Sequence, residues 1–217
     1  MKELTLLMVI LLLIFVWTTY IRKNVYLTKV KSNTGNSYLV RKLPDKQGAA
    51  DKLGGITSSL KKLCDHCEAS GSADKKKAVK RLTKKFKPNR IIEHMPGNQY
   101  VAHSVDKGEE LSLCIRAKGT DKFMDDQIIL FVAIHELAHI MTVSTGHTDE
   151  FWDNMRYLLE QASSIGIYTA VDYAKSPTEY CGMTISSTPL KIGPDEEGKE
   201  QGQEQGHEDE DTDVTHK

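Results

Sequence analysis

Apolar residues gather in two long runs along this chain, and the stretches between and after these runs are mixed or strongly charged. The first run, residues 4–21, holds eighteen residues without a charge and predicts a helix of roughly 27 Å at 1.5 Å per residue. The second run, residues 125–143, is almost wholly apolar from Ile128 to Ile134. Because a helix that is apolar on all sides is normally buried, this run predicts a long buried helix.

The length of the first run matches one hydrocarbon core, and Trp17 and Tyr20 lie near one end, where aromatic rings favour the membrane interface. No small-residue cleavage site follows, which disfavours a cleaved signal peptide; a buried core helix is the other alternative. Lys2 alone precedes the run, whereas four basic residues follow it closely: Arg22, Lys23, Lys29 and Lys31. The positive-inside rule therefore predicts a single-pass membrane protein, anchored through residues 4–21, whose C-terminal part faces the cytosol or the interior of a virion.

We expect four regions in the chain, the first being a transmembrane signal-anchor over residues 1–23. Residues 24–44 are interpreted as a juxtamembrane linker, in which 38–40 form either a short strand or an extended docking segment. Residues 45–192 have room for one catalytic domain. Residues 193–217 are almost free of apolar side chains and cannot bury enough surface to fold, so we expect a disordered acidic tail.

Within the domain, apolar periodicity and turn residues predict a mixture of helices and strands. Besides the central helix, the pattern indicates helices at 45–63, 74–86 and 148–164, and strands at 99–105 and 111–117. A glycine pair weakens the first of these helices. The charged turn at 106–110 contains a glycine and predicts that the two strands form a β-hairpin.

The central helix carries the sequence His135-Glu136-Leu137-Ala138-His139. Positions i and i+4 lie on one face of a helix, so the two histidines project side by side and can bind one Zn²⁺ through nitrogens at about 2.0–2.1 Å. Glu136 is placed to take a proton from a zinc-bound water and to deliver it to a leaving amine. The motif therefore predicts a zinc-dependent peptidase with Glu136 as its acid–base residue.

A catalytic zinc usually has three protein ligands, and His147, eight residues after His139, is the leading candidate for the third. Gly146 allows the chain to turn back toward the helix. The metzincin pattern is excluded because Thr142 and Thr145 stand where it requires glycine and histidine. Other candidates for the third ligand are acidic and lie downstream of the motif: Asp149, Glu150 and Glu179.

This motif, followed by His147 and then Glu150-Phe151-Trp152, resembles the WLM family of metallopeptidases, relatives of the SprT-like proteins, over about residues 100–165. The segment 38–47 and the later sequence Tyr180-Cys181-Gly182 look like membrane-anchored members predicted in large DNA viruses.

The resemblance implies an α+β, minimal zincin-like fold in which a small antiparallel sheet packs on the active-site helix and the following helix. It implies one zinc ion held by His135, His139 and His147, with Glu136 as the acid–base residue. Characterised relatives act on proteins crosslinked to DNA or on SUMO-linked proteins. This chain departs from them in its N-terminal anchor.

Two further groups of residues are candidates for substrate contact. Zinc peptidases often bind substrate along an edge strand beside the active-site helix, and the second hairpin strand is our candidate, through Leu111, Leu113 and Ile115. Tyr173 and Tyr180 could stabilise the transition state as phenol donors, although most tyrosines are simply packing residues.

Four cysteines occur, and a cytosol-facing domain would keep them as unlinked thiols. Cys64 and Cys67 form a C-x2-C pair that could bind a second, structural zinc with Cys114 and Cys181. The second C-x2-C pair that such sites usually contain is missing, so we favour free thiols.

The formal net charge of −1 hides a basic middle and an acidic end, so net charge excludes no class of partner. The basic run at 75–90 fits either contact with nucleic acid or anionic lipid, or a solvated helix face, and we favour the solvated face. The sequence thus predicts a membrane-anchored zinc metallopeptidase that hydrolyses peptide bonds in a protein or peptide substrate. The alternative is a non-enzymatic membrane-tethered adaptor, or an inactive peptidase homologue, that uses the basic run.

Overall fold

The computed structural model describes residues 2–70, 72–96, 102–105 and 110–191. The expected acidic tail, 193–217, and most of the expected turn at 106–110 lie outside these residues. Five α-helices are described: α1 (Lys2–Tyr26), α2 (Lys46–Ser70), α3 (Lys76–Lys85), α4 (Asp126–Met141) and α5 (Asp149–Ser164). The strands are β1 (Leu27–Lys31), β2 (Ser37–Arg41), β3 (Ile91–Glu93), β4 (Ala102–Val105), β5 (Glu110–Leu113), β6 (Thr178–Tyr180) and β7 (Met183–Ile185), and a 3₁₀ turn, η1 (Pro88–Arg90), precedes β3.

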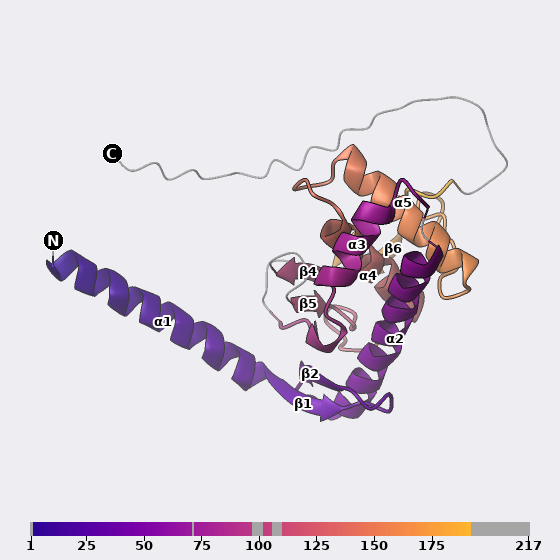
Figure 1. Ribbon diagram of the computed structural model, residues 1–217. Helices are drawn as coiled ribbons and strands as arrows, with labels where there is room; N and C mark the ends of the chain where they lie inside the picture. The colour runs from indigo at the N-terminus through magenta and orange to yellow at the C-terminus, as the bar shows by residue number, and fades with distance from the viewer. Residues whose placement is uncertain (1, 71, 97–101, 106–109, 192–217) are drawn as a thin grey trace.

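Helix α1 extends away from the body formed by the other elements (Figure 1), and its apolar side chains from Leu4 to Trp17 are exposed. Over the described residues, however, no helix is both long and apolar enough to cross a membrane. This finding contradicts the expected single-pass membrane protein anchored through residues 4–21. The expected anchor was an unbroken apolar run over residues 4–21, whereas the structure does not describe the side chains at 18–20.

The fold is α+β, as predicted, but its main sheet is mixed rather than antiparallel. Five strands lie in the order β1-β2-β3-β5-β4. The outer pairs β1–β2 and β4–β5 are antiparallel, whereas β3 runs parallel to both β2 and β5. Parallel pairing requires a long crossover, which α2 and α3 provide between β2 and β3. The predicted β4–β5 hairpin is confirmed, while the parallel pairs could not be recognised from local pattern.

Residues 24–44 were expected to be a juxtamembrane linker, but most of the segment belongs to the main sheet. The strands β1 and β2 fall within this segment and make a hairpin at one side of the main sheet. Tyr38 and Val40 of β2 are buried in the core, because alternate residues of a strand face the same side. The main sheet therefore includes residues from the start of β1 onward.

Helix α2 is longer than expected, and its glycine pair is accommodated by packing. A Cβ atom on Gly54 would lie 2.9 Å from the hydroxyl oxygens of both Ser32 and Thr34, in the β1–β2 turn. Glycine therefore lets α2 approach the hairpin closely. This contact explains why a residue that costs about 1 kcal/mol in a helix interior is present there.

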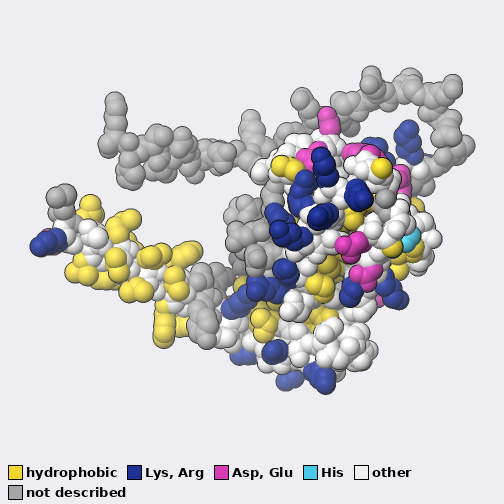
Figure 2. Space-filling view, in the orientation of Figure 1, with side chains coloured by type: hydrophobic (Ala, Val, Ile, Leu, Met, Phe, Trp, Pro, Cys, Tyr) yellow, Lys and Arg dark blue, Asp and Glu magenta, His cyan; other side chains and the backbone are white. Residues whose placement is uncertain are grey.

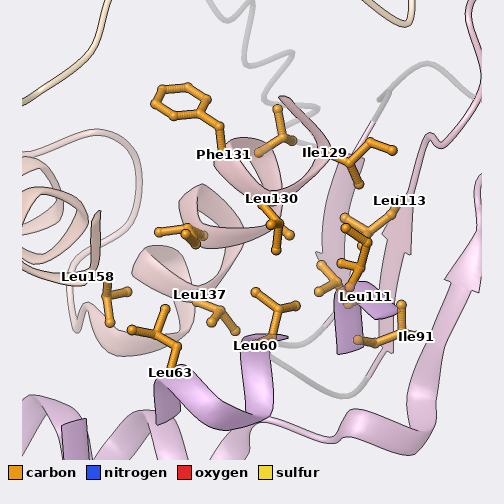
Figure 3. Close-up of a cluster of buried hydrophobic side chains, with 14 of the residues drawn as sticks. Leu60, Leu63, Ile91, Leu111, Leu113, Ile129, Leu130, Phe131, Leu137 and Leu158 are labelled. Atoms are coloured by element: carbon orange, nitrogen blue, oxygen red, sulfur yellow. The ribbon is translucent and has the colours of Figure 1, made fainter. Parts of the chain in front are cut away.

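Helix α4 runs through the centre of the core and is covered by α2, α3, α5 and the sheet. Figure 3 shows its apolar side chains meeting those of the surrounding elements. Leu60 and Leu63 come from α2, Leu111 and Leu113 from β5, and Leu158 from α5. All five are buried. The α4 residues from Ile128 to Ile134 are all buried as well, so the prediction of a buried central helix is confirmed.

An ion-pair network ties the sheet to the start of α2. The Arg116 guanidinium donates from Nε to Glu93 Oε1 at 2.7 Å, and from Nη1 and Nη2 to the two Asp45 carboxylate oxygens at 2.6 and 2.9 Å. Glu93 also accepts a hydrogen bond from the backbone N–H of Arg41. Arg116 and Glu93 are 3% and 1% exposed, so the attraction between their opposite charges must offset the cost of removing both from water.

The expectation of four unlinked thiols is half correct. Cys64 and Cys67 are free and buried in α2. Cys114 and Cys181 form a disulfide between the end of β5 and the β6–β7 hairpin, with their Cα atoms 6.2 Å apart. Since 67 residues separate the two cysteines in sequence, only the tertiary fold brings them together.

Candidate metal centre

The helix that carries the candidate ligands is fixed at both ends. The Asp125 side chain caps its N-terminus by accepting a hydrogen bond from the backbone N–H of Gln127. At the other end, the Thr142 hydroxyl donates to the carbonyl of Ala138 and accepts from the side-chain amide of Asn154 in α5. These contacts hold α4 and α5 together at the point where the chain leaves α4.

His135, His139 and His147 converge as predicted. The Nε2 atom of His135 lies 3.1 Å from Nε2 of His139 and 3.1 Å from Nε2 of His147. All three residues offer ligand atoms within 4.8 Å of one another, and no other group of three metal-binding side chains occurs in the described part of the chain. Nitrogens at tetrahedral positions around a zinc ion would be about 3.3 Å apart at the usual Zn–N distance, so the cluster has the dimensions of a zinc site.

The protonation of the cluster also suits a metal. Burial, together with smaller contributions from the neighbouring His139 and His147, lowers the pKa of His135 to about 3. His135 is therefore a neutral imidazole at physiological pH, which is the form that binds metal ions.

The loop before α5 turns where the sequence indicated. Gly146 has φ +80°, a left-handed conformation that glycine adopts without a steric penalty, and its Cβ position is open. The turn directs His147 back toward α4, although it lies beyond the end of that helix.

The acidic alternatives for the third ligand are not part of the cluster. Glu150 instead accepts hydrogen bonds from the backbone N–H groups of Val143 and Ser144. Asp149 and Glu179 are exposed.

An aromatic pair at the start of α5 packs against the three imidazoles. The fully buried Phe151 ring has its centroid 4.8 Å from that of His135, 4.3 Å from His139 and 4.7 Å from His147. Trp152 stacks on His147 at 5.6 Å. The family pattern contains these aromatic residues, but the sequence alone did not reveal that Phe151 supports all three candidate ligands.

Glu136 is buried beside His135 on α4. Tyr180 lies within its electrostatic reach: burial raises the pKa of the Tyr180 phenol, and the Glu136 carboxylate also contributes to the increase. Tyr173 packs edge-on against Phe131, one turn of α4 before His135, and belongs to the core. Of the two tyrosine candidates, only Tyr180 thus lies near Glu136.

The strand expected to be the substrate-binding edge is not at the edge of the sheet. Strand β5 lies between β3 and β4, with Leu111 opposite Ile91 on one side and Ser104 on the other. The candidate contacts Leu111, Leu113 and Ile115 are 3%, 0% and 0% exposed, so they are core residues. The strand beside β5 at the edge of the sheet is β4. Because strand order is a property of the whole sheet, the hairpin sequence did not show which of its two strands is outermost.

The basic run forms α3, an amphipathic helix. Val79, Leu82 and Phe86 face the core, and Figure 2 shows Lys and Arg side chains gathered over this helix. The basic side chains thus lie on the surface side of α3, as both interpretations of the run require. The C-x2-C pair faces inward, and burial raises the pKa of Cys64 to about 12 and that of Cys67 to about 11. Among the described residues, the pair does not belong to any group of three side chains that could hold a metal ion.

Comparison with known proteins places the chain in a family. The WLM-domain model matches residues 72–215, more than half of the chain. An uncharacterized protein of Acanthamoeba polyphaga mimivirus is 34% identical over 165 residues, which are 75% of this chain and 84% of that protein. An uncharacterized protein of Invertebrate iridescent virus 6 is 37% identical over 62 residues, 28% of this chain and 35% of that protein. Among solved structures, Wss1 from Saccharomyces cerevisiae matches with a TM-score of 0.45 and 19% identity, over 58% of this chain and 86% of that chain. The chain belongs to the WLM-domain family.

Proposed function

We propose that this protein is a zinc-dependent metallopeptidase, with zinc held by His135, His139 and His147. The observation that carries the proposal is the convergence of three imidazole nitrogens beside a buried glutamate on the same helix. Membership of the WLM family, whose members are zinc-dependent, supports it. The neutral state of His135 is consistent with metal binding.

The chemistry follows from the donor set. A zinc ion with three protein ligands and one open position lowers the pKa of water to about 7 and polarises a peptide carbonyl. A carboxylate oxygen of Glu136 takes the proton of the attacking water and then passes it to the leaving amine nitrogen. The apolar surroundings of α4 exclude bulk water from the carboxylate and so strengthen its interactions.

The role of Glu136 is tested by Glu136→Gln in the full chain. The amide keeps the size of the side chain but cannot accept the proton. We expect the variant to bind zinc like the wild type and to lose cleavage of an unfolded protein substrate by at least about 100-fold, the lower bound for removal of general acid–base catalysis. The matched control is Glu160→Gln, an exposed glutamate of α5, which should cleave like the wild type.

Three results would distinguish the alternatives. The proposed peptidase function is supported if Glu136→Gln still binds zinc but loses cleavage, while Glu160→Gln cleaves like the wild type. Equal cleavage by Glu136→Gln and the wild type contradicts the assigned role of Glu136. Zinc binding without cleavage of folded, unfolded or DNA-bound protein substrates would favour the inactive peptidase homologue instead.

A further inference from the structure

The third histidine is held differently from the other two. His135 and His139 are fixed by α4, whereas His147 lies in the segment 142–148 between α4 and α5 and is exposed. Its position relative to the cluster therefore depends on the conformation of that segment. A segment without regular hydrogen bonding must be fixed by other contacts if the third ligand is to be in place before metal arrives.

One carboxylate provides such contacts. Glu150, in the first turn of α5, accepts from the backbone N–H of Val143 at 3.1 Å, from the backbone N–H of Ser144 at 3.3 Å and from the Ser144 hydroxyl at 3.1 Å. The Ser144 hydroxyl is also 2.7 Å from that of Thr148, so the start of the segment is bonded to its end. Hydrogen bonds to a charged carboxylate are stronger than neutral ones, which suits this fixing role.

A cation from a third helix completes the arrangement. Arg81 of α3 donates to the carbonyl oxygen of Met141, the last residue of α4, and its Nη1 lies 3.8 Å from Glu150 Oε1. The hydrogen bond from the backbone N–H of Val143 is the largest cause that lowers the pKa of Glu150, and the charge of Arg81 lowers it as well. The carboxylate is therefore ionised at neutral pH, and it joins the ends of α3, α4 and α5 around the histidine-bearing segment.

We infer that Glu150, assisted by Arg81, is a positioning residue that sets the His147 segment in its metal-binding conformation. The inference rests on the proposed zinc site. Glu150 acts on the backbone that carries the ligand, and its loss should weaken zinc binding without preventing it. At saturating zinc, turnover should return close to the wild-type value because His147 is still present.

The test compares zinc affinity of full-length variants by competition with a chromogenic chelator. Glu150→Ala removes all three acceptor contacts, and we expect affinity to fall about 10–100-fold, the usual effect of losing a group that orients a metal ligand. Glu150→Gln keeps one acceptor oxygen and should lose less. The matched control is Asp149→Asn, the exposed neighbouring acid in the same helical turn, which should bind zinc like the wild type. The Co²⁺-loaded absorption spectrum at saturation should be the same for all four proteins.

The outcomes separate this inference from the proposed function. If the wild type binds no zinc, the proposed zinc site itself is wrong. If the wild type binds zinc and Glu150→Ala binds it equally well, the positioning role is wrong and the zinc site stands. Should Glu150→Ala fail to fold, Arg81→Gln decides with Lys80→Gln as its control: weaker zinc binding by Arg81→Gln alone supports the inference, and unchanged binding overturns it.

Discussion

Removing the Phe151 ring is expected to be among the most destabilising single substitutions near the candidate site. Phe151 is 0% exposed, and its ring centroid lies 4.3–4.8 Å from those of all three candidate ligands. Phe151→Ala would leave a cavity between α4 and α5, which the hydrogen bond from Asn154 to Thr142 holds at a fixed separation nearby. For a fully buried phenylalanine, the loss of transfer free energy and the cavity together cost about 3–5 kcal/mol of unfolding free energy.

Its neighbour supplies an internal comparison. Trp152 is larger but 38% exposed, and it contacts the cluster through His147 and the Phe151 ring. We expect Trp152→Ala to cost about 1 kcal/mol, the ordinary value for a single substitution. The expected order is therefore the reverse of the order of side-chain size.

The assay is urea unfolding of the zinc-free proteins, followed by circular dichroism, with the free energy obtained by linear extrapolation. Measuring without metal separates packing from ligand binding, because any zinc bound to the native state adds its own stabilisation. A loss for Phe151→Ala no larger than that for Trp152→Ala would refute the reasoning that this ring is the packed support of the three imidazoles.

Three further predictions concern contacts outside the cluster. Arg116→Met leaves the buried Glu93 carboxylate without its cation and should cost about 3–5 kcal/mol in urea unfolding; a loss below about 1 kcal/mol would contradict the ion-pair account. The hydrogen bond from Arg116 is the main cause that lowers the pKa of Asp45 in the folded protein. The ionised Asp45 therefore stabilises the fold above its unfolded pKa of about 3.9, and this stabilisation is lost as the pH falls through the lower folded pKa. Asp45→Asn should flatten the curve of unfolding free energy against pH below about pH 4, and an unchanged curve would contradict the lowered pKa. Replacing Cys114 and Cys181 together by serine should lower the unfolding free energy by about 2–4 kcal/mol, and thiol titration of the denatured wild type should find two free thiols rather than four.

The features that the sequence predicted well are local. The i, i+4 spacing of His135 and His139 requires only a helix, and the uninterrupted apolar run around them predicts one. Gly146 predicted the turn that brings His147 back, because a left-handed φ is favoured by glycine itself and does not depend on distant parts of the chain. The β4–β5 hairpin follows from a short charged turn between two strands.

The features that the sequence did not predict are set by the whole fold. Leu111 was assigned to an edge strand, yet β3 pairs with it from a segment far from the hairpin in sequence. The Cys114–Cys181 disulfide likewise depends on the tertiary fold, which brings the β6–β7 turn to the end of β5 from 67 residues away in sequence. Glu150 was a candidate for the third metal ligand, whereas in the structure it accepts hydrogen bonds from the backbone of the segment before α5. These contacts depend on the backbone conformation of that segment, which hydrophobic periodicity does not predict.

The expected membrane anchor was wrong for a different reason. The expectation used the length of the uncharged run at residues 4–21. Over the described residues, no helix is both long and apolar enough to cross a membrane. The resemblance to the WLM family did not depend on this run, and the family match covers residues 72–215.

The central claim is that three imidazoles hold one zinc ion, and X-ray absorption at the zinc edge of the purified full-length protein tests it most directly. The account predicts one zinc per chain with three imidazole nitrogens at about 2.0–2.1 Å. His147→Ala should then retain two imidazole ligands, because His135 and His139 are fixed independently on α4. Absence of bound zinc, sulfur ligands at about 2.3 Å, or an identical ligand shell in His147→Ala would contradict the site described for this protein.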